Sequence, residues 1–444
     1  MKVTPLDEWI CRKISVPSGG LSKNVLKEFQ LEKLNTTLRH VRKNSRFYQR
    51  HLEGMPETIN SMEDLGDFPF LTSSDLQAHS SEMVCVPMGE ISRIVTMNTS
   101  GTTGIPKRIY FTPDDQELTI DFFGIGMSTF VDESDRVLIL LPDTTPGSVG
   151  DLLFTGLSRI GVKPVRHGPI VNLQETLSII SEMRITSLVG APTQLLALCR
   201  FCEINQGNNP IELKSILLST DHVPESLART LEESWKCRVY NHYGMTEMGL
   251  GGGVFCDADF GYHLREADMI FEIIDPTTGE KQPDGVLGEL VFSTLTRKGM
   301  PLIRYRTGDL ARFLSSPCPC SSTLRSLDKV TNRIDQSFLI GSEEFHLSEM
   351  DEVLFSCPDL INFQIRIDHD QIKDTIFFQL YSLRPLTEIS HYYDAISSYL
   401  DKKQVNPDSY NIIVKTLTGF PSELASLQKR KVIENDLKQF AKNY

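Results

Sequence analysis

Four short apolar segments constrain the fold most, because helix-like sequence separates or follows them. They are RVLILLP (136–142), ITSLVGAP (185–192), LKSILLST (213–220) and CRVYNHYG (237–244). Their length and their β-branched and aliphatic residues are typical of buried strands, whereas PTQLLALCRFCEIN (192–205) and PESLARTLEESW (224–235) have the length of helices. This alternation predicts α/β layers around a largely parallel sheet.

The segments on either side of this region have different patterns. Residues 1 to about 90 have mostly helical periodicity, and residues 269–295 contain two apolar runs joined by Gly- and Pro-containing turns, as in an antiparallel β subdomain. With 444 residues, the chain exceeds the size at which one core keeps growing. We therefore expect a large N-terminal domain, residues 1–334, of layered sheets and helices with a β subdomain. Residues 335–444 are expected to form a small α+β domain.

Charge and cysteine content argue against several classes of protein. A net charge of −13 argues against nucleic acid or an anionic membrane as the main partner. No uninterrupted apolar run reaches the length of about 18 residues that a membrane span needs. The start, MKVTPLDEWICRK, lacks the apolar centre of a secretory signal, and nine cysteines then favour reduced thiols or metal ligands over disulfides. We expect a cytoplasmic protein.

A segment rich in glycine and threonine, NTSGTTGIPKR (98–108), lies between two apolar, strand-like runs. It is typical either of an ordinary surface hairpin or of a loop that binds phosphate, because glycines let the backbone approach an anion while hydroxyls and a lysine bind its oxygens. Its spacing excludes a kinase-type P-loop, which needs four residues between the glycines. The candidate phosphate ligands are Thr99, Ser100, Gly101, Thr102, Thr103, Gly104 and Lys107.

Four segments together resemble one family. TSGTTGIPK (99–107), YNHYGMTEMG (240–249), DPTTGEKQPDGVLGELVFSTL (275–295) and LIRYRTGDLARF (302–313) follow one another as in adenylate-forming enzymes. Essentially the whole chain is similar to the phenylacetate–CoA ligase branch of that superfamily. The resemblance implies that a carboxylic acid reacts with ATP and Mg²⁺ to give an acyl-adenylate, whose acyl group then passes to the thiol of coenzyme A.

The resemblance assigns roles to individual residues of these segments. Tyr243, followed by Gly244 in a turn, resembles the aromatic residue that stacks on adenine, and Asp309 resembles the carboxylate that binds the ribose hydroxyls. Thr246 resembles a hydroxyl near the α-phosphate, and Glu247 resembles the carboxylate that holds Mg²⁺. The alternative is a plain strand end and turn with Tyr243 packed in the core.

Two further places belong to the predicted nucleotide and acid site. Ser219, Thr220 and Asp221 correspond to a stretch that lines adenine and the acyl group, where the family often has Gly-Ala-Glu. These residues make that wall more polar and narrower than a simple phenyl group would need. His242 either approaches the acyl carboxylate or caps a strand.

The C-terminal domain is expected to be mobile, because the resemblance places a hinge at Arg333 and Asp335, with Arg333 also near the ribose. Members of the family carry a catalytic lysine close to the C-terminus. In LQKRKVIEND, Lys429 is the best match and Lys431 the second, while one alignment puts Gln428 at the catalytic position. A basic helix face is the alternative interpretation of this run.

The cysteines fall into two groups. Cys256 and His263, with Cys318 and Cys320 in a later loop, would complete a tetrahedral Cys₃His site for a structural zinc ion. Some members of the family carry a comparable set; free thiols in loops are the alternative. Cys199 and Cys202 lie three residues apart in an apolar, helix-like run, so we expect them to pack in the core.

Three functions remain open from the sequence. The first is an acyl- or aryl-CoA ligase acting on a small aromatic or acyl carboxylic acid. The second is an adenylating enzyme that loads a carrier-protein thiol, because Gly341-Ser342 stands where the family has an Arg-Gly pair beside the thiol entry. The third is a nucleotide-binding relative without turnover. The residues also leave open whether the chain forms a homodimer.

Overall fold

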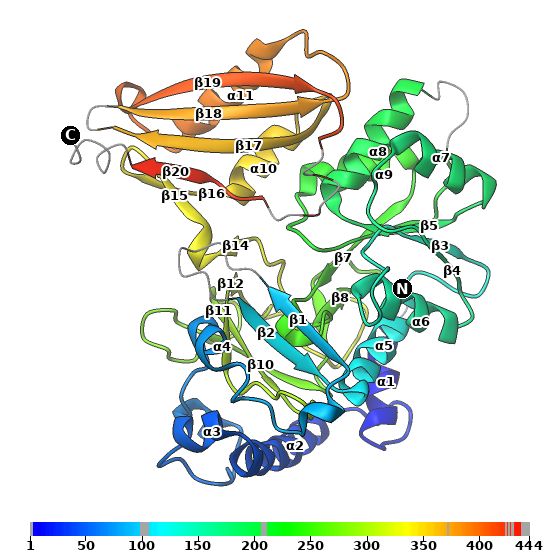
Figure 1. Cartoon of the computed structure of the whole chain (residues 1–444), viewed down its shortest axis with the longest axis vertical. Helices are drawn as coiled ribbons and strands as arrows, with labels where there is room; N and C mark the ends of the chain where they lie inside the picture. The colour runs from blue at the N-terminus through cyan, green and yellow to red at the C-terminus, as the bar shows by residue number, and fades with distance from the viewer. Residues whose placement is uncertain are drawn as a thin grey trace. The chain divides into compact units, whose positions relative to one another are not determined.

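The chain forms two compact units, each built from segments that are distant in sequence (Figure 1). The computed structural model describes residues 3–97, 106–205, 211–370, 373–421, 424, 427 and 430–436, with only the backbone at 335 and 436. Unit 1 comprises Met1–Ser134, Asp143–Lys163 and His242–Val330, and unit 2 comprises Asp135–Pro142, Pro164–Asn241 and Thr331–Tyr444. The α/β fold class is confirmed, and the domain boundary at 334/335 stays a prediction.

Unit 1 is a mixture of helices and mainly antiparallel strands. Its helices are α1 (Pro5–Lys13), α2 (Lys23–Asn44), α3 (Arg46–His51), α4 (Ser73–His79), α5 (Pro113–Met127) and α6 (Val149–Arg159). Its strands are β1 (Arg93–Met97), β2 (Lys107–Phe111), β8 (Gly253–Phe255), β9 (Tyr262–Leu264), β10 (Met269–Ile274), β11 (Gly288–Thr294), β12 (Tyr305–Ala311) and β13 (Ser326–Leu327). β10, β11 and β12 pair antiparallel, which confirms the predicted β subdomain.

Buried Arg304 connects the helical N-terminal region to this sheet. Its guanidinium donates to the carbonyl oxygens of Gly66 at 2.7 Å and Phe68 at 2.6 Å, and it pairs with Glu272 of β10 at 3.2 Å. It also lies 4.0 Å from the ring centre of Phe70. A buried guanidinium is tolerated only when its donors are satisfied, so these contacts hold two distant segments together.

The junction between β2 and α5 is fixed by a capping box. Thr112 accepts a hydrogen bond from the backbone N–H of Asp115, whose carboxylate in turn accepts from the backbone N–H of Thr112. The same carboxylate accepts from the backbone N–H groups of Lys298 and Gly299, at 2.8 and 2.9 Å. β2 is therefore held at its end, which fixes the strand that begins with Lys107.

The first half of unit 2 is the predicted parallel sheet. Its elements are β3 (Arg136–Ile139), β4 (Lys163–Arg166), α7 (Leu173–Glu182), β5 (Ser187–Gly190), α8 (Pro192–Asn205), β6 (Ser215–Leu218), α9 (Glu225–Trp235) and β7 (Arg238–Tyr243). The first residue of β4 and the last two of β7, His242 and Tyr243, belong to unit 1. The pairs β3–β5, β5–β6 and β6–β7 are all parallel, as predicted. Cys199 and Cys202 are buried on α8, which confirms their packing role, and burial raises the pKa of both thiols to about 12.

The second half of unit 2 is an α+β fold around a four-stranded sheet. Its elements are β14 (Asn332–Arg333), β15 (Ser337–Ile340), β16 (Glu343–His346), α10 (Leu347–Phe355), β17 (Leu360–His369), β18 (Asp374–Ser382), α11 (Ile389–Lys402), β19 (Tyr410–Thr418) and β20 (Ile433–Asp436). The strand order is β19-β18-β17-β20, with β17–β18 antiparallel and the outer pairs parallel. α10 packs on α11 and β17 (Figure 1).

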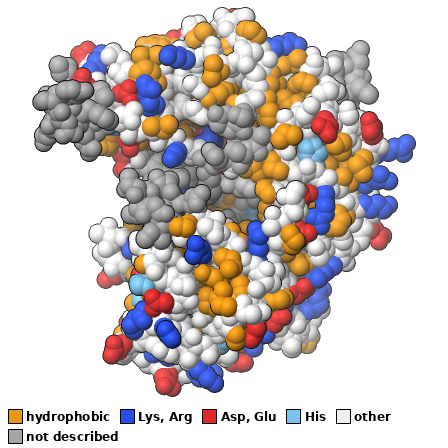
Figure 2. Space-filling view, in the orientation of Figure 1, with side chains coloured by type: hydrophobic (Ala, Val, Ile, Leu, Met, Phe, Trp, Pro, Cys, Tyr) orange, Lys and Arg blue, Asp and Glu red, His pale blue; other side chains and the backbone are white. Residues whose placement is uncertain are grey.

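None of the helices in the described part of the chain combines the length and the apolarity that a membrane crossing requires. Figure 2 shows acidic and basic side chains interspersed on the face that it draws.

Candidate functional site

Lys107 and Glu247 form a buried ion pair in unit 1. Lys107 is the first residue of β2 and lies opposite Met97 in the antiparallel pair with β1, which confirms the strand–loop–strand prediction. Its ammonium donates to Oε1 of Glu247 at 2.7 Å, and the two side chains are 18% and 6% exposed. The predicted phosphate ligands Thr99 to Gly104 lie outside the described residues. The lysine that follows them is nevertheless placed beside the carboxylate predicted to hold Mg²⁺.

Three hydrogen-bond donors determine the charge of Glu247. Burial by itself raises the pKa of this carboxyl, but the Lys107 ammonium, together with the backbone N–H of Glu247 and the hydroxyl of Tyr305, outweighs burial and holds the pKa below its ordinary value. The Tyr305 hydroxyl donates to the same Oε1 at 3.2 Å. Glu247 is therefore a carboxylate at neutral pH. The predicted role of Glu247 as a cation ligand needs this charged form.

Tyr243 and Asp309 are joined by a second buried contact. The phenol of Tyr243, at the end of β7, donates to Oδ2 of Asp309 on β12 at 2.6 Å. The backbone N–H of Asp309 donates to the hydroxyl of Thr307 at 3.0 Å. The residue predicted to stack on adenine and the residue predicted to bind ribose thus lie together, although 66 positions separate them in sequence.

The turn after Tyr243 requires glycine. A Cβ atom added to Gly244 would lie 2.2 Å from the carbonyl oxygen of Leu250, so no other residue fits without moving the backbone. The chain then enters a single 3₁₀ turn, η3 (Thr246–Met248), which carries Thr246 and Glu247. The turn and the short helix together place the Glu247 carboxylate next to the ammonium group of Lys107.

His242 is a neutral, half-buried residue of β7. Its ring lies edge-on to Phe123 at a centroid distance of 6.1 Å. Burial lowers the pKa of His242 to about 4, so the imidazole is uncharged at neutral pH. It can take part in hydrogen bonding there but cannot supply positive charge to a carboxylate.

The other predicted residues of the site belong to unit 2. Ser219, Thr220 and Asp221 follow β6, and Thr220 has a φ of 80°, a conformation that costs energy for a β-branched residue. Arg333 is half-buried on β14. Lys429 and Gln428 lie outside the described residues, whereas Lys431 is described and exposed.

Three cysteines and one histidine form a cluster in unit 1. The ligand atoms of Cys256, His263, Cys318 and Cys320 all lie within 4.8 Å of one another, and all four residues are buried. The sulfurs of Cys256 and Cys318 are 3.5 Å apart, and the sulfur of Cys320 is 3.4 Å from Nε2 of His263. Tetrahedral zinc with these ligands implies separations of about 3.5 to 3.8 Å, so the donor set fits.

Two residues at or near the site were not selected from the sequence. Tyr305 lies inside the LIRYRTGDLARF segment, and this position in the motif could have indicated that it belongs to the site. Arg430 pairs with Asp351 and contacts Asp221, but its only sequence signal was a short basic run.

The AMP-binding enzyme family matches residues 42–296, which is more than half of the chain. The chain therefore belongs to the AMP-binding enzyme family.

Relatives and solved structures agree with this assignment. The phenylacetate-coenzyme A ligase of Aromatoleum evansii is 29% identical over 386 residues, covering 81% of this chain and 82% of that ligase. The enzyme of the same name from Thermus thermophilus is 26% identical over 370 residues, covering 80% and 81%. A crystal structure of 2-hydroxyisobutyryl-CoA ligase in complex with 2-HIB-AMP matches 95% of this chain and 92% of its own, with a TM-score of 0.79 and 20% identity. The last similarity shows a shared fold.

The Lys107–Glu247 pair generates a direct prediction about catalysis. Glu247→Gln keeps the size and the hydrogen-bond acceptor but removes the charge, so metal-dependent formation of acyl-adenylate should fall by about 10²-fold. The measurement is acid-dependent release of pyrophosphate from ATP. The matched control is Glu233→Gln, an exposed position on α9, which should leave release unchanged. Undiminished release by the Glu247→Gln protein would show that this carboxylate has no such role.

Proposed function

We propose that the chain is an AMP-forming acid–thiol ligase. A carboxylic acid attacks the α-phosphorus of ATP, pyrophosphate leaves, and the thiol of coenzyme A then displaces AMP from the acyl-adenylate to give a thioester. Membership of the AMP-binding enzyme family and relatives named phenylacetate-coenzyme A ligase support this proposal. The observation that carries it is the placement of Lys107, Glu247, Tyr243 and Asp309 in one unit.

In this proposal, each residue acts on a part of the nucleotide. The first step brings a carboxylate against a polyanionic triphosphate, so positive charge and hydrogen-bond donors must screen the repulsion. Lys107, with residues 99–104 before it, supplies such donors. Tyr243 stacks on adenine, and Asp309 accepts hydrogen bonds from the ribose hydroxyls. The Tyr243–Asp309 contact then preorganises both groups before the nucleotide arrives.

A bound Mg²⁺ would supply charge neutralisation between the phosphate oxygens. The Glu247 carboxylate and the nearby Thr246 hydroxyl are oxygen donors of the kind that Mg²⁺ prefers, so these residues fit the ion. In this role, Glu247 must stay ionised inside the protein, and the contact with Lys107 stabilises its charge.

We infer that the acid is an aromatic or other small organic acid. The relatives' names favour an arylacetic acid, whereas Ser219, Thr220 and Asp221 make the wall they form more polar than a phenyl group requires. A polar substituent on the acid would find hydrogen-bond partners in this stretch.

The acid and the acceptor can be tested in one series of assays. We expect the purified protein to release pyrophosphate from ATP and Mg²⁺ with at least one member of a panel containing phenylacetate, hydroxyphenylacetates, benzoate, hexanoate and pyruvate. Free coenzyme A should then be consumed with formation of a thioester. No acid-dependent release with any member would contradict the proposal and favour a nucleotide-binding relative without turnover.

A separate observation favours the alternative in which the acyl group passes to a carrier-protein thiol, and a separate assay result would support it. Gly341 forms the turn between β15 and β16, with a φ of 62°, and its N–H donates to Asp374 at 2.9 Å. This turn differs from the family's Arg-Gly pair beside the thiol entry. Pyrophosphate release without consumption of free coenzyme A, combined with acylation of a phosphopantetheine carrier protein, would support this alternative.

We also propose that Cys256, His263, Cys318 and Cys320 hold a structural zinc ion. These four ligands would close the coordination sphere and leave no position for a substrate, so the ion would stabilise the fold and not react. The ion would connect two segments that are far apart in sequence, the turn after β8 and the loop between β12 and β13.

The zinc proposal predicts the metal content of the protein. Elemental analysis of protein purified without chelator should give about one zinc per chain. Cys318→Ser should lose the metal and lower the midpoint of thermal unfolding, because binding free energy adds to folding free energy. Cys237→Ser, at a thiol outside the cluster, should retain the metal. Wild-type protein without zinc would refute the site.

A further inference from the structure

Arg430 binds two carboxylates that come from distant segments of unit 2. Its Nη2 donates to Oδ2 of Asp351 on α10 at 2.9 Å, and Nη1 donates to the other oxygen of the same carboxylate. Its Nε lies 3.4 Å from Oδ2 of Asp221, in the stretch after β6. We call these three residues the Arg430 latch. The latch brings Arg430 next to Asp221, in the stretch 219–221.

Two of the three latch side chains are almost closed to water, whereas that of Asp221 is 27% exposed. The side chains of Arg430 and Asp351 are 10% and 1% exposed, and the guanidinium lies 5.1 and 5.4 Å from the ring centres of Phe355 and Phe363. Burial alone lowers the pKa of Arg430, but Asp351 and Asp221 outweigh it and raise the pKa above its ordinary value. Arg430 is therefore permanently charged. A buried bidentate pair of this kind fixes geometry more firmly than a surface ion pair does.

Glu352, the residue after Asp351 on α10, makes a second contact between the C-terminal half of unit 2 and its first half. The carboxylate of Glu352 accepts hydrogen bonds from the backbone N–H groups of Glu225 and Ser226, at 2.6 and 3.0 Å. These groups begin α9, whose N-cap residue, Pro224, makes no side-chain capping bond. Glu352 of α10 thus satisfies donors that α9 cannot satisfy itself, and its charge complements the positive end of the helix dipole.

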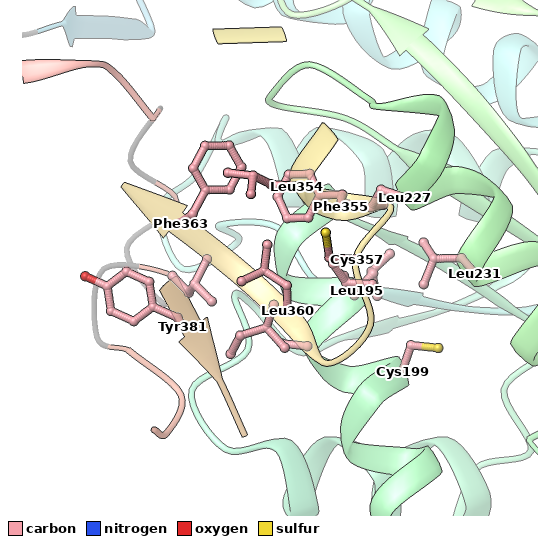
Figure 3. Close-up of a cluster of buried hydrophobic side chains, with 14 of the residues drawn as sticks. Leu195, Cys199, Leu227, Leu231, Leu354, Phe355, Cys357, Leu360, Phe363 and Tyr381 are labelled. Atoms are coloured by element: carbon pink, nitrogen blue, oxygen red, sulfur yellow. The ribbon is translucent and has the colours of Figure 1, made fainter. Parts of the chain in front are cut away.

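An apolar seam surrounds these polar contacts. Figure 3 shows Leu195 and Cys199 of α8 and Leu227 and Leu231 of α9 near side chains of the C-terminal half. All belong to one cluster of buried side chains, which also includes Leu354, Phe355, Cys357, Leu360 and Phe363. α8 packs on β17, and α9 packs on α10. The C-terminal fold is therefore docked on these helices by both apolar burial and directional bonds.

A third contact holds the chain just before the latch. Nε2 of Gln194, a fully buried residue of α8, donates to the carbonyl oxygen of Leu424 at 2.7 Å, while its Oε1 accepts from the backbone N–H of Ile170 at 3.1 Å. Leu424 thus contacts α8, and Arg430 contacts Asp221 after β6, both in the first half of unit 2, while Arg430 also pairs with Asp351 of the second half. In sequence, residues 425–429 lie between Leu424 and Arg430. This interval contains both Gln428 and Lys429.

We propose that Arg430, paired with Asp351 and in contact with Asp221 of the stretch 219–221, is a positioning residue for the adenylation half-reaction. This proposal rests on the proposed function, because it takes 219–221 as part of the acid and adenine wall. Lys429 and Lys431 are the covalent neighbours of Arg430, so fixing Arg430 restricts where either ammonium can reach. Breaking the latch should impair acyl-adenylate formation and leave the later transfer to thiol largely intact.

The test separates the two half-reactions in variants of the latch. Arg430→Met alone would leave Asp351 buried without its partner, so Arg430→Met is combined with Asp351→Asn to remove both charges. Arg430→Lys is the conservative variant, which keeps the charge but loses the bidentate geometry. Arg366→Met is the matched control, because Arg366 pairs with Asp368 at an exposed site on β17.

Three measurements are made on each full-length protein. The first is pyrophosphate release with ATP, Mg²⁺ and the most active acid of the panel. The second is thioester yield from coenzyme A and the corresponding synthetic acyl-adenylate. The third is hydrogen–deuterium exchange of peptides covering residues 424–436. Thermal unfolding reports whether each variant is folded.

The double variant should lose about 30- to 100-fold in pyrophosphate release, since a displacement of about 1 Å can cost about 10²-fold. Its thioester yield from synthetic adenylate should stay within about threefold of wild type, and exchange of residues 424–436 should rise. Arg430→Lys should show the same pattern with a smaller loss, and Arg366→Met should match wild type in all three measurements.

Equal loss of both half-reactions, or unchanged release and exchange, would overturn the proposal. If the double variant does not fold, Arg430→Lys decides by the same criteria. A wild-type protein that releases no pyrophosphate with any acid contradicts the proposed function and with it the adenylation role. Exchange of residues 424–436 then still shows whether the latch holds this segment.

Discussion

The ion pair between Lys107 and Glu247 is the contact on which the site of unit 1 depends. It joins the first residue of β2 to the turn after β7, two places 140 residues apart in sequence. Removing two charges from water costs several kcal/mol per ion, and an apolar pair of similar size would often be as stable. Stability alone therefore gives little reason to bury these charges. A buried pair of charges in the same unit as Tyr243 and Asp309 is what the proposed site for a charged nucleotide needs.

Unit 2 also contains a buried cation that is held by carboxylates. Arg430 is buried beside two aromatic rings that contact each other, and it is held by Asp351 and Asp221, as Lys107 is held by Glu247. The Glu352 cap on α9 and the Gln194 contact to Leu424 reinforce this arrangement. If residues 335–444 moved away from α8 and α9, the contacts of Arg430 with Asp221, of Glu352 with α9 and of Gln194 with Leu424 would have to break, which gives such a movement an energetic cost. The Arg430–Asp351 pair lies within residues 335–444 and could stay intact.

Much of the fold could be predicted from the sequence, because short apolar runs alternate with helical ones from β3 to β7 and turn residues mark β10 and β11. The metal cluster could be selected as well, since Cys256, His263, Cys318 and Cys320 are the right ligand types, although only the structure shows that their atoms converge. The strand order β19-β18-β17-β20 could not be predicted from the sequence, because it depends on pairing between strands that are distant in sequence. Arg430 was missed for a related reason: a basic run indicates a solvated helix face until its buried partners are known.

In the proposed reaction, ATP is cleaved to AMP through an acyl-adenylate before the thiol reacts. The most direct measurement is a single-turnover reaction of enzyme, ATP, Mg²⁺ and acid without coenzyme A, followed by mass analysis of the quenched products. We expect an acyl-adenylate in an amount close to that of the enzyme, which disappears with release of AMP when coenzyme A is added. Release of ADP and phosphate, or a thioester formed without any acyl-adenylate, would contradict it.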